Sequence, residues 1–179
     1  MKTLATCIAA TLISLSAGAA WAQKSGHLTD PQIAAIVDTA NQVDIDAGKL
    51  AKSTSHSKDV QQFAQQMITD HTAVNKSASE LATKLGVTPE LSVSSGKLQK
   101  GGDQNVDALK KLQGHAFDKA YIDHEVSYHE AVLKMLDKTL IPSAQNAELQ
   151  ALLVKVRPAF EAHLEHARKL HAELAKSAA

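Results

Sequence analysis

The segment VQQFAQQMITDHTAVNKSASEL, residues 60–81, has the clearest helical pattern of the chain. Its apolar residues recur every three or four positions, which places them along one face of an α-helix. The stripe consists of Val60, Phe63, Ala64, Met67, Val74, Ala78 and Leu81. His71 lies inside this stripe, where a buried polar group without a partner costs roughly 1–3 kcal/mol. The segment therefore predicts a core helix that carries one polar group in need of a partner.

On both sides of this segment the sequence predicts further helices and shows no strand pattern. Asp30 is the expected N-cap of the first helix, with Pro31 at the first helical position. Gly86 is expected to end the second helix, and Pro158 to bend the fourth. The four predicted helices span about Pro31–Ser53, residues 58–85, His115–Leu140 and Pro142–Lys176.

A long stretch rich in glycine and serine separates the second and third predicted helices. We predict a loop over Val87–Gln104 and a short amphipathic piece over Val106–Leu112. Two short connections and one long one predict an all-α, ferritin-like four-helix bundle with a long crossover between helices two and three. A simple up-and-down bundle remains an alternative, because the long loop could also fold back on itself.

The first 22 residues have the features of a signal peptide. Lys2 gives a positive start, Leu4–Ala19 is an apolar run, and Ala20-Trp21-Ala22 fits the small-x-small cleavage pattern. The run is shorter than the ~20 apolar residues of a membrane-spanning helix. We therefore expect residues 1–22 to be removed and residues 23–179 to form a single helical-bundle domain, periplasmic or secreted, with no transmembrane span in the mature chain.

Composition narrows the classes of protein. The chain has 19 basic and 19 acidic residues, and it lacks a basic block interleaved with aromatic residues, so nucleic acid is not an expected partner. Its one cysteine, Cys7, lies in the predicted signal peptide, so the mature chain is expected to be stabilised by packing without a disulfide. The nine histidines are the unusual feature of the composition.

Polar residues interrupt the apolar stripes of the predicted helices. Asp44, His71 and His163 fall near the centre of the stripe on the first, second and fourth helices. The third helix has two overlapping apolar faces, and periodicity does not decide between them. With ~1.5 Å of rise per residue in a crossover bundle, these positions share one central layer with Glu125 and His129 of the third helix.

The two faces of the third helix bury different polar groups. The face that contains Tyr121 would bury Asp118, Glu125 and His129, whereas the other face would bury His124. Imidazole and carboxylate groups in this mixture can bind zinc, iron or manganese. The candidate metal ligands are Asp44, His71, Glu125, His129 and His163.

The spacing of these ligands departs from the diiron pattern of bundles, which uses Glu-x-x-His on two helices. Here the third helix has Glu125-x-x-x-His129 instead. The alternative to a metal site is a structural network, in which His71 and His163 would form hydrogen bonds across the core. Neither alternative indicates a reaction, and no residue is assigned a catalytic role.

Several stretches resemble an exported bacterial family known only as domain of unknown function number 4142, which has a ferritin-like bundle. The resemblance implies the crossover topology, and it implies that His129, not His124, is the inward histidine of the third helix. It implies no activity. At the helix-one stretch the family usually has Glu-x-Glu, where this chain has the shorter Asp44. The matching stretches are Phe63–His71, Phe117–Ile122 with Val126 and His129, Pro158–Leu164, and Asp44–Ala51.

Two functions from different classes follow as expectations. In the first, an exported ferritin-like bundle acts by binding, with a divalent transition metal in its core, or serves in envelope stress. In the second, the bundle is a structural or protein-interaction module that docks another envelope protein and contains a buried His/Asp network without metal. The sequence leaves the oligomeric state open.

Overall fold

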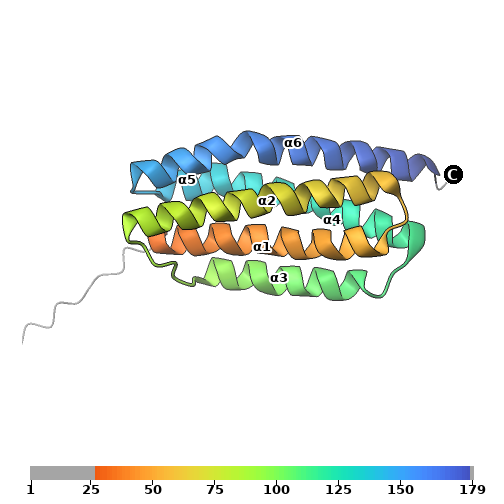
Figure 1. Ribbon diagram of the computed structural model, residues 1–179, viewed down its shortest axis with the longest axis horizontal. Coiled ribbons are helices and arrows are strands. Elements are labelled where there is room, and N and C mark those ends of the chain that lie inside the picture. Colours follow the sequence, from red (N-terminus) through yellow and green to blue (C-terminus); the bar gives the residue numbers. More distant parts are fainter. Residues whose placement is uncertain (1–26, 178–179) are drawn as a thin grey trace, which may run out of the picture.

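The computed structural model describes residues 27–177, and every regular element within that range is helical, which confirms the all-α prediction. The predicted signal peptide lies outside the described residues. A π-helical turn, η1 (Leu136–Leu140), and a short helix, α5 (Ile141–Ser143), follow the third of the long bundle helices. These four long helices are α1 (Asp30–Thr54), α2 (Lys58–Leu85), α4 (Gly114–Met135) and α6 (Ala147–Ser177), drawn in Figure 1.

The stretch predicted as a long loop contains another helix, α3 (Val93–Leu109), so the loop prediction over Val87–Gln104 is wrong from residue 93 onward. The start of α3 has a reciprocal cap. The hydroxyl group of Ser92 accepts from the backbone N–H of Ser95 at 3.1 Å, and the Ser95 hydroxyl accepts from the N–H of Ser92 at 2.8 Å. This cap offsets part of the low helix propensity of the glycines that follow.

Close packing against α1 explains why a glycine-rich segment becomes helical. A Cβ atom at Gly102 would lie 2.6 Å from the side chain of Val43, so only glycine allows this approach. Figure 1 shows α3 alongside α1, on the side of α1 that faces away from α2 and α6. The short amphipathic piece predicted over Val106–Leu112 is the end of this helix and the turn after it.

The four long helices are arranged as neighbours that run in opposite directions within each pair. α1 packs along α2, and α4 packs along α6, so the bundle consists of two antiparallel pairs. Because α3 carries the chain back along the bundle, α2 and α4 point in the same direction (Figure 1). All four long helices therefore contribute their middle turns to the same central region.

The first helix begins one residue earlier than predicted. Thr29, and not Asp30, is its N-cap, and the Thr29 hydroxyl accepts from the N–H of Gln32 at 3.4 Å. The carboxylate of Asp30 instead accepts from the N–H groups of Gln145 and Asn146 at 2.8 and 2.9 Å. These bonds join the start of α1 to the connection that precedes α6.

The last helix begins later than predicted, at Ala147 and not at Pro142. The side-chain oxygen of Asn146 accepts from the N–H of Glu148 at 2.8 Å, which caps the new start. α6 then continues through Pro158 without ending. At the other boundary, Gly86 ends α2 with φ +65°, as the sequence predicts.

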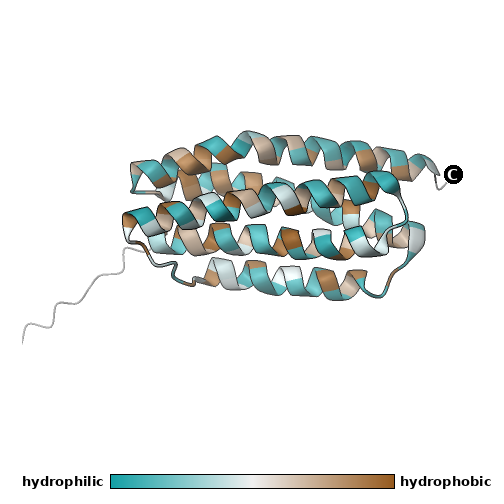
Figure 2. Ribbon diagram, in the orientation of Figure 1, coloured by the Kyte–Doolittle hydropathy of each residue, from teal (hydrophilic) through white to brown (hydrophobic). Residues whose placement is uncertain are grey.

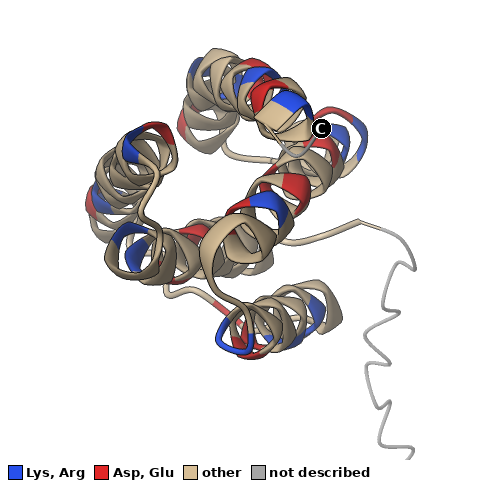
Figure 3. Ribbon diagram, turned by 90° about the vertical axis from the view of Figure 1, so that its right-hand side faces the viewer, with Lys and Arg blue, Asp and Glu red and all other residues tan. Residues whose placement is uncertain are grey.

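The core consists of two apolar clusters, one toward each end of the bundle. Figure 2 shows hydrophilic and hydrophobic residues alternating along each helix, and Figure 3 shows charges of both signs around the outer faces. Between residues 27 and 177, no helix combines the length and apolar character that crossing a bilayer requires. The first cluster includes Phe63, Met67, Phe117, Tyr121, Ile122 and Leu170, and the second includes Ile33, Ile36, Val132, Leu136, Leu153 and Phe160.

Candidate metal centre

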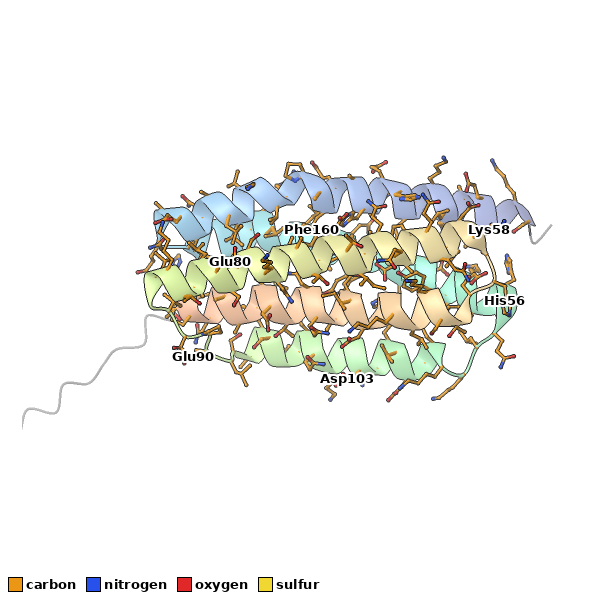
Figure 4. All side chains as sticks on the ribbon, viewed as in Figure 1. His56, Lys58, Glu80, Glu90, Asp103 and Phe160 are labelled. Atoms are coloured by element: carbon orange, nitrogen blue, oxygen red, sulfur yellow. The ribbon has the colours of Figure 1, made fainter. Side chains whose placement is uncertain are left out.

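A layer of polar side chains separates the two apolar clusters. Its members are at most 2% exposed, although they come from four different helices. Figure 4 labels Phe160, which lies near the middle of α6 and has its ring centroid 5.0 Å from that of His71. We call this set the polar layer; it consists of Asp44 from α1, His71 from α2, Glu125 and His129 from α4, and His163 from α6.

Three imidazole rings form a triangle within the polar layer. The ring centroids of His71 and His129 are 5.7 Å apart, those of His71 and His163 are 5.3 Å apart, and those of His129 and His163 are 5.4 Å apart. One nitrogen from each ring lies within 4.8 Å of the nitrogens offered by the other two. The three histidines that were expected to face the core therefore lie together in one compact site.

Two carboxylates complete the polar layer. Asp44 Oδ2 lies 2.8 Å from His71 Nε2 and 3.5 Å from His129 Nε2. Glu125 Oε2 lies 3.5 Å from His129 Nδ1. Ligand atoms of Asp44, Glu125 and His129 also lie within 4.8 Å of one another. His129 thus belongs both to the histidine triangle and to a group with the two carboxylates.

The outer nitrogen of His71 is held by an amide chain. His71 Nδ1 lies 2.8 Å from Asn41 Oδ1, and the Asn41 amide nitrogen donates to Asn75 Oδ1 at 2.7 Å. Because that second bond fixes the Asn41 oxygen toward the ring, Nδ1 is the nitrogen of His71 that carries a proton. The Nε2 atom of His71 is therefore the one presented to the polar layer.

The other two histidines are held in the same way. His129 Nδ1 donates to the backbone carbonyl of Glu125 at 3.0 Å, and His163 Nε2 pairs with Asp70 Oδ2 at 2.8 Å. Each ring therefore uses one nitrogen to bond an oxygen outside the histidine triangle. In metal sites, a ligating histidine commonly donates its second nitrogen to such an oxygen.

The inward atoms of the polar layer lack hydrogen-bond partners within the described part of the chain. They are both carboxylate oxygens of Asp44 and of Glu125, together with His71 Nε2, His129 Nε2 and His163 Nδ1. Asp44 Oδ2 and His71 Nε2 are close enough for a hydrogen bond, but their relative direction does not meet its angular requirement. Unpartnered buried groups are rare in folded proteins, and here they converge.

Burial and mutual contact separate the acidities of the two carboxyl groups. Burial raises the pKa of Asp44, but the neighbouring His71 and His129 outweigh burial and hold that pKa well below its usual range. Burial raises the pKa of Glu125 well above its usual range, and the nearby Asp44 raises it further. Asp44 is therefore the stronger acid of the two and is ionised at neutral pH, whereas Glu125 holds its proton more tightly than an exposed glutamate does.

The ionised Asp44 requires a positive charge beside it, because an isolated buried charge is strongly disfavoured. Burial lowers the pKa of His129 to about 4, so that ring is neutral at neutral pH. Burial also lowers the pKa of His163. A cation bound in the polar layer would supply a positive charge next to Asp44.

The donor set fits a first-row transition metal. Zinc binds imidazole nitrogen at about 2.0–2.1 Å with tetrahedral geometry, so two ligand atoms of one ion are about 3.4 Å apart. The separations of up to 4.8 Å within each ligand group need side-chain movements to reach that distance. Nitrogen and carboxylate donors in combination suit zinc, iron and manganese.

Histidines outside the polar layer occupy different environments. His124 is half-buried and stacks on Tyr128 with a centroid distance of 5.5 Å, so the inference from family resemblance that His129 is the inward histidine is correct. Sequence reasoning missed the role of Asn41, which is 1% exposed and lies three residues before Asp44 on the same face of α1. The three-residue spacing between Asn41 and Asp44 is the sequence signal that could have identified Asn41 as an inward residue.

The fold and the polar layer define an all-helical protein with a buried cluster of histidines and carboxylates. The chain belongs to the family described as Domain of unknown function (DUF4142), which matches residues 15–170. No curated protein and no solved structure gave a match to the chain. Family membership therefore supports the resemblance seen in the sequence and gives no activity.

Proposed function

We propose that the polar layer binds a divalent transition metal ion, which is zinc, iron or manganese. The observation that carries this proposal is the shared arrangement of the three histidines. Each ring bonds an oxygen through one nitrogen and leaves the other nitrogen unpartnered among the described residues, facing the layer. A hydrogen-bonded network would use both nitrogens, whereas a metal site needs one of them free as a lone pair.

The charges of the site support the same proposal. Asp44 is ionised at neutral pH, and a cation bound beside Glu125 would favour its ionised form, with any displaced proton released to solvent. A divalent ion with these two carboxylates would be electrically neutral overall, which suits a buried position. The proposed ligands are His71, His129 and Asp44, with His163 and Glu125 next to them. A bound ion would act as a Lewis acid or, if it were iron or manganese, also in electron transfer.

We further propose that the chain is an exported ferritin-like bundle. The parallel direction of α2 and α4, and a polar layer that draws on four helices, support this assignment. The pattern of residues 1–22 supports export to the periplasm or beyond. Intact-mass measurement of the protein from the periplasm of its host should give a chain that begins at Gln23, and a mass that includes Met1 would contradict export with cleavage.

A structural or protein-interaction role is the second candidate. It is supported by the 2.8 Å distance between His71 Nε2 and Asp44 Oδ2, which is short enough for a hydrogen bond, and by the His163–Asp70 pair at the same distance. Under this proposal the protein would dock an envelope partner through its surface, and its core would take up no metal.

Elemental analysis separates the two proposals. Untagged protein purified from its native compartment should contain close to one zinc, iron or manganese ion per chain, or regain it after dialysis. Replacing both His71 and His163 with alanine should remove the metal. His171→Ala is the matched control, because the side chain of His171 is 50% exposed on α6 and lies outside the polar layer. Full metal content in the double variant would exclude this site.

A further inference from the structure

The polar layer is closed toward both ends of the bundle. A cation that travelled along the bundle axis would have to pass one of the two apolar clusters. Moving a bare ion into such a medium costs on the order of 20 kcal/mol by idealised solvation estimates. An ion must therefore reach the layer from the side, along polar groups. These clusters include Phe63, Met67, Phe117 and Tyr121 on one side of the layer and Ile36, Val132, Leu136 and Phe160 on the other.

One hydrogen-bonded pair, His163 and Asp70, connects the polar layer to the surface. The side chain of His163 is 3% exposed, and its Nε2 atom lies 2.8 Å from Oδ2 of Asp70, whose side chain is 41% exposed. The other nitrogen of His163 has no hydrogen-bond partner in the described range and belongs to the histidine triangle. A negatively charged group at the surface is thus separated from the layer by a single imidazole ring.

The other outward bonds of the polar layer do not offer the same connection. His129 donates to a backbone carbonyl that lies within the core. His71 bonds Asn41, which is 1% exposed and leads on to the half-buried Asn75. These partners are neutral, so they attract a hydrated divalent cation far less than a carboxylate does.

We propose that Asp70 and His163 form the uptake route for the metal ion of the polar layer. This inference rests on the proposed metal binding. Asp70 concentrates a hydrated divalent cation at the seam between α2 and α6, and His163 transfers the ion inward to His71, His129 and Asp44. Asp70 is therefore a residue that governs the rate of loading, beyond its bond to His163.

The test compares two carboxylates with similar exposure. Asp70→Asn removes the charge and retains an oxygen that can accept from His163. Asp123→Asn is the control, because Asp123 also lies near a histidine, with 3.1 Å between its Oδ1 and His171 Nε2, and its side chain is 40% exposed. Metal-free parent and variants are mixed with Co²⁺, a spectroscopic substitute for the proposed ions, and association and dissociation rate constants are measured separately.

We expect Asp70→Asn to lower the association rate constant about tenfold, in the range by which local charge accelerates ion binding, without faster dissociation. Asp123→Asn should leave both constants within about twofold of the parent, a change too small for steering. An unchanged association rate constant with faster dissociation in Asp70→Asn would show that Asp70 only supports His163. Equally slow association in Asp70→Asn and Asp123→Asn would show a general charge effect. Either result overturns the uptake route. If the parent binds no metal at all, the proposed function itself fails.

Discussion

The two apolar clusters and the polar layer between them are equally buried but differ in what stabilises them. In the cluster that contains Phe63 and Tyr121, packed rings with centroids 6.1 Å apart gain free energy simply by leaving water. In the polar layer, Asp44 and Glu125 have lost water, and their oxygens have no hydrogen-bond partner within residues 27–177. Burial therefore stabilises the clusters by itself, whereas the layer needs a further component.

This difference indicates what the polar layer contributes. Leucine residues in its place would stabilise the bundle more than unpaired polar groups do, because buried charges gain stability only when they are fully paired. A bound metal ion would satisfy lone pairs of His71, His129 and Asp44 at once and would turn the layer into a stabilising element. The contribution of the polar layer to the free energy of unfolding should therefore depend on metal and on pH. The contribution of the apolar clusters should depend on neither.

The largest effect is expected in an apolar cluster. Phe63→Ala should lower the free energy of unfolding by about 3–5 kcal/mol, because it leaves a cavity at a fully buried position. The loss should be the same with and without metal, as measured by urea unfolding in both conditions. A loss that appears only in the metal-free protein would contradict the separation of the cluster from the polar layer.

Acidification should weaken the polar layer through His129. Its pKa is about 4 in the folded protein and 6.5 ordinarily, so the unfolded chain binds more protons between these values. The metal-free parent should therefore lose stability from this group as pH falls from 6.5 to about 4, by up to about 3 kcal/mol. Because other groups also titrate, the measurement is the difference between the parent and His129→Gln, and a difference constant over this window would refute the assignment.

Metal should stabilise the parent protein and not a variant in which His71 and His163 are replaced. An ion at 100 times its dissociation constant adds about 2.7 kcal/mol to the free energy of unfolding. Calorimetry should show this as a higher Tm for the parent and for His171→Ala at neutral pH. The variant with both His71→Ala and His163→Ala should show no shift, and an equal shift in all three proteins would assign the effect to another site.

Replacing Glu125 should stabilise the metal-free protein, by less than the changes described above. The raised pKa of Glu125 means that the folded protein keeps a proton that the unfolded chain releases, so its contribution to stability decreases as pH rises above the ordinary value. Glu125→Gln has no proton to lose. The metal-free variant should therefore have a Tm a few degrees above the parent at pH 7, with an advantage that grows with pH. A lower Tm of the variant at pH 7 would contradict the raised pKa of Glu125.

Much of this arrangement is readable in the sequence because helices repeat regularly. His71 and His163 interrupt clear apolar stripes, so their inward orientation follows from spacing alone. The choice between His129 and His124 does not, because α4 has two overlapping apolar faces. There the family resemblance supplied information that periodicity lacked, and the burial of His129 agrees with it.

Other features depend on contacts between distant segments and could not be read locally. α3 contains Gly96, Gly101 and Gly102, which have low helix propensity, and tertiary packing of Gly102 on Val43 overrides that propensity. Likewise, the bond between Asp70 and His163 joins residues 93 positions apart. Its existence depends on how α2 and α6 are aligned, which no single helical wheel contains.

Anomalous diffraction would reveal a metal ion in the polar layer by its position as well as its presence. Crystals of untagged protein equilibrated with Zn²⁺ at neutral pH would be measured on both sides of the zinc absorption edge. We predict an anomalous peak about 2.0–2.2 Å from Nε2 of His71, Nε2 of His129 and a carboxylate oxygen of Asp44. A fully ordered polar layer without a peak, with a hydrogen bond joining His71 Nε2 to Asp44, would contradict the metal site and support the structural network.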